Sequence, residues 1–142
     1  MKKMKSISLM FPLYKDKNTV EIMIKKSSRI LKKLKRKYEI IIVDDGCPEK
    51  SGELALKISR KFSNIKIFFH KKNLGYGAAL KTGLKKCKND LIFQIDGDDE
   101  YDVNDLSSLL KASENNDLVI TYRYKKKYST YRMLISWVYN AI

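Results

Sequence analysis

Six acidic residues cluster directly after an apolar segment, in a chain whose formal charge is +14. Segment 91–95 leads into them without an intervening Lys or Arg, and they are Asp96, Asp98, Asp99, Glu100, Asp102 and Asp105. Carboxylates this close repel one another unless a cation lies among them. The alternating set Asp96, Asp98 and Glu100 provides the oxygen ligands that a hard divalent ion requires. The sequence therefore predicts a metal site at the end of a strand.

Two well-known kinds of carboxylate site do not fit this spacing. A calcium loop of the EF-hand type needs Gly at its sixth position and Glu at its twelfth, but counting from Asp96 these positions hold Tyr101 and Ser107. A phosphoryl-receiver domain would use the pair Asp44 and Asp45 directly after its first strand, whereas here a complete strand and helix precede the pair. The interpretation that fits is a divalent ion that joins the diphosphate of a nucleotide to the alternating carboxylates.

Short apolar segments alternate with amphipathic ones along the chain. The expected strands are 7–11, 38–43, 65–69, 91–95 and 118–122. The expected helices begin near 18, 54, 78 and 103, and a last amphipathic segment covers 131–138. The almost continuous apolar run 38–43 is typical of a strand buried on both faces of a parallel sheet. The alternation predicts an α/β fold with a mainly parallel sheet flanked by helices.

Several local features of these elements are also predicted. We expect Pro12 to end the first strand, because it lacks the N–H that a sheet ladder uses. Asn18 and Glu21 have the spacing of a helix-capping pair. In the third helix, Leu80 and Leu84 are expected to face inward, and Gly83 to allow close packing on the sheet.

Polar or charged clusters follow four of the expected strands, at 12–16, 44–45, 96–100 and Arg123. In parallel α/β sheets, ligands bind beyond the carboxyl ends of the strands. All four clusters should therefore lie along one edge of the sheet and form a single site.

The composition indicates what kind of partner this site would bind. At 142 residues the chain has the size of one domain, and 30 Lys and Arg outnumber 16 Asp and Glu. The excess predicts an anionic partner, namely nucleotide phosphates, an acidic membrane surface or nucleic acid. Nucleic acid is disfavoured because the basic residues are spread along the chain without a recognisable reading motif.

The remaining composition favours a cytoplasmic protein. Cys47 and Cys87 lack metal-binding or disulfide spacing and are expected to be reduced thiols. No segment has the length of a membrane span or a signal peptide, so any membrane contact is expected to be peripheral, on the cytoplasmic face. The lysines at 125–127, beside Arg123, form a basic loop that fits an anionic acceptor or lipid headgroups.

Four segments, in this order and spacing, resemble family 2 glycosyltransferases: Phe11-Pro12-Leu13-Tyr14-Lys15-Asp16, Ile42-Val43-Asp44-Asp45-Gly46-Cys47, Asn73-Leu74-Gly75-Tyr76-Gly77-Ala78-Ala79 and Asp96-Gly97-Asp98. The chain most resembles the polyprenyl-phosphate (dolichol-phosphate mannose synthase-like) members. Segment 120–124 and the later Arg132, Ser136 and Asn140 continue the resemblance, which covers essentially the whole chain. Because catalytic domains of this family are generally longer, we expect 1–142 to be a single catalytic domain that is short at its C-terminal side.

The resemblance implies a GT-A fold that binds a UDP- or GDP-linked sugar together with Mg²⁺ or Mn²⁺. It assigns the base and ribose to Pro12, Tyr14 and Asp16, and further base contacts to Val43 and Asp45, while Asp44 shapes the turn. It assigns the metal and diphosphate to Asp96, Gly97 and Asp98, with Glu100 as a third metal ligand where the family usually has Gln. Arg123, and more weakly Arg132, would bind phosphate. Lys15 and Asp16 stand where the family usually has Asn and Glu, so the contact made by the shorter Asp16 side chain is left open.

The implied reaction is an inverting transfer of the sugar by direct displacement, with Asp98 and Arg123 as the catalytic residues. The acceptor is expected to be a polyprenyl phosphate, which is already anionic and needs no general base. A saccharide hydroxyl as acceptor, or a nucleotide-sugar-binding module without turnover, are the alternatives.

Purely structural roles also remain open for several of these residues. Tyr14 could cover the sheet edge and Asp45 could cap the following turn. Gly75 and Gly77 are expected to serve backbone geometry, and His70 is expected to be a strand-end residue without a catalytic role. Nothing in the sequence indicates an oligomeric state.

Overall fold

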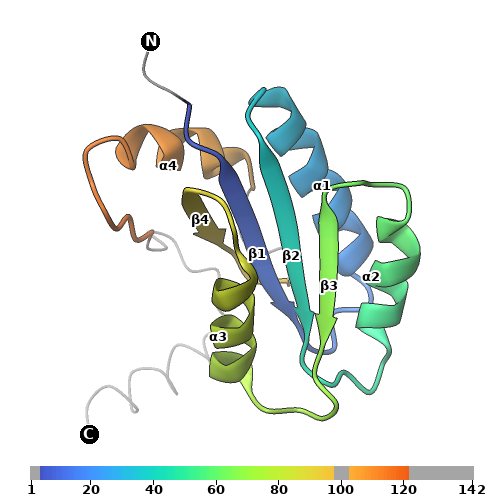
Figure 1. Ribbon diagram of the computed structural model, residues 1–142. Coiled ribbons are helices and arrows are strands. Elements are labelled where there is room, and N and C mark those ends of the chain that lie inside the picture. The colour runs from blue at the N-terminus through green and yellow to red at the C-terminus, as the bar shows by residue number, and fades with distance from the viewer. Residues whose placement is uncertain (1–3, 98–102, 122–142) are drawn as a thin grey trace, which may run out of the picture. The chain divides into compact units, whose positions relative to one another are not determined.

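The computed structural model describes residues 4–97 and 103–121 of the chain (Figure 1). The chain divides into two compact units, 1–107 and 108–142. All four strands and the first three helices belong to the first unit.

The first unit is built on a four-stranded parallel sheet in the order β3-β2-β1-β4. Its strands are β1 (Ile7–Leu13), β2 (Tyr38–Asp44), β3 (Ile65–Phe69) and β4 (Leu91–Gln94). The helices between them are α1 (Val20–Lys33), α2 (Ser51–Ser59) and α3 (Tyr76–Lys86). These elements confirm the predicted α/β fold with a parallel sheet.

The helices form a layer on each face of the sheet (Figure 1). The crossovers through α1 and α2 both step from β1 towards β3, whereas the crossover through α3 steps back across the sheet to β4. Since such crossovers are right-handed, the change of direction puts α3 on the face opposite α1 and α2. β1 is buried along its whole length, as expected for an inner strand covered on both faces.

β1 continues two residues past its predicted end, because Pro12 is part of the strand and lies opposite Val43 of β2. The Met10 carbonyl accepts the Ile95 N–H at 3.0 Å on the β4 side. Backbone groups two residues apart in a strand point in the same direction, so Pro12 also faces the β4 side. Pairing with β4 ends at Met10, so no ladder bond is lost at Pro12.

The start of α1 differs from its prediction. Thr19 is the N-cap residue, and its side chain makes no capping bond. Its hydroxyl instead donates to the Gly97 carbonyl at 2.7 Å, so the predicted capping pair Asn18–Glu21 does not form in this way. The bond ties the beginning of α1 to the segment after β4.

The inward face of α3 is formed by small residues. Ala79 and Gly83 are buried, Leu80 is partly buried, and Leu84 is 48% exposed, so the prediction for Leu84 is wrong. A Cβ on Gly83 would overlap the end of the Met10 side chain, which confirms the predicted close packing. The helix therefore contacts the sheet through its backbone, and larger residues point away from it.

After β4, a short 3₁₀ turn (Val103–Asp105) leads into α4 (Leu106–Ala112), near the predicted fourth helix. The predicted strand 118–122 is not formed by its described part, 118–121. Leu118 and Ile120 are 76% and 77% exposed there. A short apolar run forms a strand only when a neighbouring strand pairs with it, which explains why the pattern alone was misleading. The amphipathic segment 131–138 lies outside the described residues.

Candidate functional site

A pocket of about 310 Å³ opens at the carboxyl edge of the sheet. It is bounded by the end of β1, the residue after β2, the start of α3 and the segment after β4. Its lining residues are Pro12, Leu13, Tyr14, Asp16, Asp45, Asn73, Gly75, Tyr76, Ala79, Asp96 and Gly97. Polar clusters after three strands therefore meet at one edge, as the sequence predicts.

Six of the predicted site residues line this pocket: Pro12, Tyr14, Asp16, Asp45, Asp96 and Gly97. Val43 does not, because it is fully buried beneath α3 in a core cluster with Met10, Ile41 and Ala79. The structure therefore places Val43 in the core, outside the lining of this pocket, and its predicted base contact stays a prediction. Asp98, Glu100, Arg123 and Arg132 lie outside the described residues, and their roles stay predictions.

The loop after β1 is closely packed against the segment after β4. Asp16 Oδ2 accepts the Tyr14 N–H at 2.9 Å, which closes a tight turn. A Cβ on Gly97 would lie 2.7 Å from the Pro12 carbonyl oxygen and 3.2 Å from Asp16 Oδ2. Only glycine therefore lets the two segments approach this closely at the pocket floor.

Asp96 is oriented by two side chains that the sequence did not single out. Its Oδ1 accepts a hydrogen bond from the Tyr76 hydroxyl at 2.7 Å, and Gln94 Nε2 lies 3.3 Å from the same oxygen. Gln94 Nε2 also donates to the Tyr76 hydroxyl at 3.1 Å. Among the described residues, Asp96 Oδ2 has no hydrogen-bond partner, so one carboxylate oxygen is available to a cation or ligand.

Asp44 shapes the turn after β2, as expected. Its Oδ1 accepts the Cys47 N–H at 2.8 Å, and its Oδ2 accepts the Gly52 N–H at 2.6 Å in the first turn of α2. The residue is 4% exposed, so its carboxylate is used within the protein.

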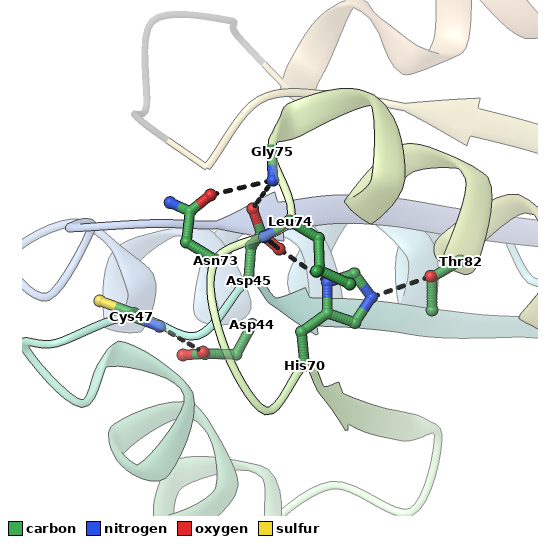
Figure 2. A network of polar contacts seen from close by, with 8 residues as sticks. All are labelled: Asp44, Asp45, Cys47, His70, Asn73, Leu74, Gly75 and Thr82. Atoms are coloured by element: carbon green, nitrogen blue, oxygen red, sulfur yellow. Dashed lines mark hydrogen bonds and ion pairs between the residues drawn. The ribbon is translucent and has the colours of Figure 1, made fainter.

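Asp45 makes a larger network that the sequence reasoning missed (Figure 2). Its Oδ1 lies 2.6 Å from His70 Nδ1 and accepts the Leu74 N–H at 3.0 Å, while its Oδ2 accepts the Gly75 N–H at 2.8 Å. His70 Nε2 lies 2.9 Å from Thr82 Oγ1 on α3. Asp45 therefore holds the loop that leads into α3. The predicted structural role was only to cap the turn that directly follows Asp45.

The strand register carries a signal that could have indicated this network. Asp44 is paired with Phe69, so the next residues along β2 and β3, Asp45 and His70, lie side by side. The His70 N–H donates to the Asp44 carbonyl at 2.8 Å and extends this pairing.

The two cysteines are free thiols, as predicted, but their surroundings differ. Burial raises the pKa of the Cys47 thiol, but hydrogen bonds from Ser51, Lys15 and Glu49 outweigh it and hold this pKa below its usual value. The Lys15 N–H lies 3.1 Å from Cys47 Sγ and the Ser51 hydroxyl 3.2 Å. Burial raises the pKa of the Cys87 thiol.

Within 4–97 and 103–121, no group of three or more His, Cys, Asp and Glu side chains is arranged to hold a metal ion. Of the predicted ligands, only Asp96 belongs to this part of the chain. No helix of the described part is long and apolar enough to cross a membrane.

The sequence pattern of the family described as glycosyl transferase family 2 matches residues 8–140. Two similar proteins are named undecaprenyl-phosphate 4-deoxy-4-formamido-L-arabinose transferase. The protein from Photorhabdus laumondii is 28% identical over 97% of this chain, and the protein from Yersinia enterocolitica is 30% identical over 99%. The chain spans 43% of the length of each, which is less than half of these curated relatives.

Solved structures with a similar fold include a mannosyltransferase. The mannosyltransferase PcManGT from Pyrobaculum calidifontis, in complex with GDP-Man and Mn²⁺, matches with a TM-score of 0.65 at 14% identity over 79% of this chain and 32% of its own. Glucosyl-3-phosphoglycerate synthase from Mycobacterium tuberculosis, in complex with Mn²⁺, UDP and phosphoglyceric acid, matches with a TM-score of 0.53 at 20% identity over 66% and 33%. S. aureus TarS 1-349 matches with a TM-score of 0.58 at 18% identity over 85% and 40%.

These likenesses confirm the predicted GT-A fold. The pocket at the carboxyl edge of the sheet is where this class of α/β fold binds ligands. With its sequence matched from residue 8 to residue 140, the chain belongs to glycosyl transferase family 2.

Proposed function

We propose that this chain forms the donor-binding part of a glycosyltransferase that moves a sugar from a UDP- or GDP-linked donor to a polyprenyl phosphate. The observation that carries the proposal is that one pocket brings Asp96 together with the ends of β1 and β2. The names of the related undecaprenyl-phosphate transferases support the acceptor, and the GDP-Man and UDP complexes with Mn²⁺ support the donor.

One side of the pocket has the chemistry to bind a nucleoside. Pro12 and the exposed Tyr14 ring offer apolar surface for a flat base, and Asp16 and Asp45 offer carboxylate oxygens for ribose hydroxyls or base N–H groups. The apolar surface would pack against the flat face of the base, and the carboxylates would bind polar groups at its edge or on the ribose.

The other side of the pocket fits a hard divalent cation. Asp96 presents one carboxylate oxygen that no described residue occupies, and its other oxygen is fixed by Tyr76. Oxygen donors of this kind suit Mg²⁺ or Mn²⁺. We propose Asp98 and Glu100 as further ligands and Gly97 as the point of close approach to the diphosphate. A bound ion would neutralise charge on the departing diphosphate.

In the proposed reaction, an anionic oxygen of the acceptor phosphate attacks the anomeric carbon and forms a new C–O bond with inversion. The bond from that carbon to the nucleoside diphosphate breaks, and the electron pair leaves with the diphosphate. Asp98 and Arg123, with Arg132, would act on the diphosphate side, Arg123 by stabilising its charge. Such an acceptor places the reaction at a membrane surface, and a net charge of +14 would attract the chain to anionic headgroups on the cytoplasmic face.

Isothermal titration of this chain with UDP and with GDP, with and without Mn²⁺, tests the proposal. We expect one nucleotide to bind and Mn²⁺ to strengthen its binding. Asp96→Asn keeps the shape of the side chain but removes its charge, and should weaken Mn²⁺-dependent binding by about tenfold or more. Glu53→Gln, which changes an exposed side chain on α2, is the matched control and should bind like the wild type.

Absence of any nucleotide binding would refute the proposal. If the nucleotide binds, incubation with donor and a polyprenyl phosphate decides between turnover and a binding module without turnover. Transfer to a saccharide hydroxyl, but not to the lipid phosphate, would show that the proposed acceptor is wrong.

A further inference from the structure

Three segments that are distant in sequence are joined by one imidazole ring beside Asp45, which lines the pocket (Figure 2). His70 follows β3, its Nδ1 faces Asp45 after β2, and its Nε2 faces Thr82 in the middle of α3. Only 10% of the His70 side chain and 4% of the Asp45 side chain are exposed. Contacts between such enclosed polar groups are strong and depend on geometry.

The partners of His70 fix where its protons lie. An ionised carboxylate only accepts hydrogen bonds, so Nδ1 carries the ring proton and its N–H donates a hydrogen bond to Asp45 Oδ1. In the neutral ring, Nε2 is then an acceptor, and the Thr82 hydroxyl donates to it. This arrangement determines the orientation of the ring, in the way that a second partner orients a ligating histidine.

These contacts use most of the hydrogen bonds that the Asp45 carboxylate can accept. A carboxylate accepts about four hydrogen bonds. Oδ1 is used by His70 and by the Leu74 N–H, while Oδ2 accepts the Gly75 N–H. One acceptor position on Oδ2 is therefore left within the described structure, and Asp45 lines the pocket. Tilting the carboxylate away from this orientation would break the hydrogen bonds that it accepts from the Leu74 and Gly75 N–H groups.

We infer that His70 and Thr82 are positioning residues for nucleotide binding. They hold Asp45 with Oδ2 available to the ligand, and through Asp45 they hold the wall formed by Asn73 and Gly75. This inference rests on the proposed function, because it deepens the role of the same pocket. It also assigns His70 a role that the sequence did not indicate.

Substitutions that remove the His70–Thr82 contact alone, or both this contact and the His70–Asp45 contact, test the inference. Thr82→Val has nearly the shape of the wild-type residue but removes the hydroxyl, whereas Thr82→Ser keeps the hydroxyl. His70→Asn keeps a side-chain donor for Asp45 but cannot reach Thr82, and His70→Leu removes both contacts. Ser59→Ala, which removes a largely buried hydroxyl on α2 far from the pocket, is the matched control.

The measurement is the affinity for the nucleotide that the wild type binds, by isothermal titration at constant Mn²⁺ and well below each variant's Tm. We expect Thr82→Val and His70→Asn to bind about three- to tenfold more weakly, and His70→Leu more weakly still. Thr82→Ser should restore affinity to within about twofold. Ser59→Ala should lower Tm without changing the affinity. Long-range ¹H–¹⁵N spectra should show His70 protonated at Nδ1 in the wild type, with a shifted Nε2 resonance in Thr82→Val.

The outcomes distinguish this inference from the proposed function. If the wild type binds and both Thr82→Val and His70→Leu bind equally well, the positioning role is refuted while the proposed function stands. If the wild type binds neither UDP nor GDP, the proposed function fails and the inference falls with it.

Discussion

Gly46 forms the turn after β2 in a conformation that an alanine would strain in two ways. Its φ is +64°, in the left-handed region, and a Cβ there would overlap the Lys72 backbone and lie 2.5 Å from the Asn73 nitrogen. Left-handed backbone costs an L-residue about 1–2 kcal/mol. The overlap is with backbone, which cannot rotate away as a side chain does, so segment 72–73 must move.

Moving that segment would disturb the two backbone hydrogen bonds that Asp45 accepts just beyond it. These come from Leu74 at 3.0 Å and Gly75 at 2.8 Å, and a hydrogen bond to a charged group contributes about 1.5–3 kcal/mol. We therefore expect Gly46→Ala to lower the free energy of unfolding by about 3–5 kcal/mol and Tm by about 10 °C or more. Nucleotide binding should weaken as well, because the same segment forms the pocket wall.

Alanine substitutions at two other glycines allow the cost of backbone strain to be distinguished from the cost of steric overlap. Gly75 has φ +93° but open space around its Cβ position, so Gly75→Ala should cost only the backbone strain, about 1–3 kcal/mol. Gly77 has neither a left-handed φ nor a close neighbour, and it lies in the first turn of α3. Gly77→Ala should therefore stabilise the protein by about 0.5–1 kcal/mol.

Urea denaturation of the three variants and the wild type, followed by circular dichroism at 222 nm, measures these differences. The expected order of stability is Gly77→Ala, wild type, Gly75→Ala and Gly46→Ala. If Gly46→Ala were as stable as Gly75→Ala, the overlap with the 72–73 backbone would not hold in solution and the reasoning would be refuted.

Three further predictions concern parts of the molecule outside the pocket. Lys35 follows α1 with φ +51°, so Lys35→Gly should raise the free energy of unfolding by about 0.5–1 kcal/mol in the same urea experiment; a loss of stability would contradict the helix-end geometry. For Glu39, burial raises the pKa, but hydrogen bonds from Lys66, Ser8 and Lys88 bring it below the usual 4.5. Because the unfolded chain then takes up the proton at higher pH, this stabilisation is present above about pH 4.5 and is lost as pH falls through the folded pKa; Glu39→Gln should flatten the fall of Tm with pH in that range. Cys47 should react with iodoacetamide at neutral pH faster than Cys87, because its lowered pKa gives more thiolate; equal rates by peptide mass spectrometry would contradict this.

The strands up to β4 were predictable from their short runs of mainly apolar residues. Residues 38–43 are apolar at nearly every position because β2 is covered on both faces, and segment 65–69 was identified with its observed bounds. Val43 belongs to the core cluster beneath α3 and does not line the pocket, so the structure gives no support to a ligand contact there. The resemblance to a family, rather than the residue pattern, suggested that contact.

The parts that were not predictable depend on contacts between distant residues. Asp45 and His70 are 25 positions apart, and only the pairing register of β2 and β3, which the local sequence of neither strand determines, brings them together. The apolar run 118–121 looks like a strand, but pairing with a neighbour decides whether one forms. On α3, periodicity alone favoured Leu84 as a core residue, yet the helix approaches the sheet so closely that glycine and alanine occupy the interface.

The strand order also determines when the two sides of the pocket form during folding. β1, β2 and β3 pair as neighbours in sequence, whereas β4 pairs with β1 across some eighty residues, with Ile7 opposite Leu91. Since distant pairings close large loops and form late, the side of the pocket made by β1 and β2 should assemble before Asp96 arrives. During synthesis from the N-terminus, the first three strands can pair while β4 is still inside the ribosome. A folding intermediate of this chain would therefore contain the wall around Asp45 but lack the carboxylate that completes the pocket.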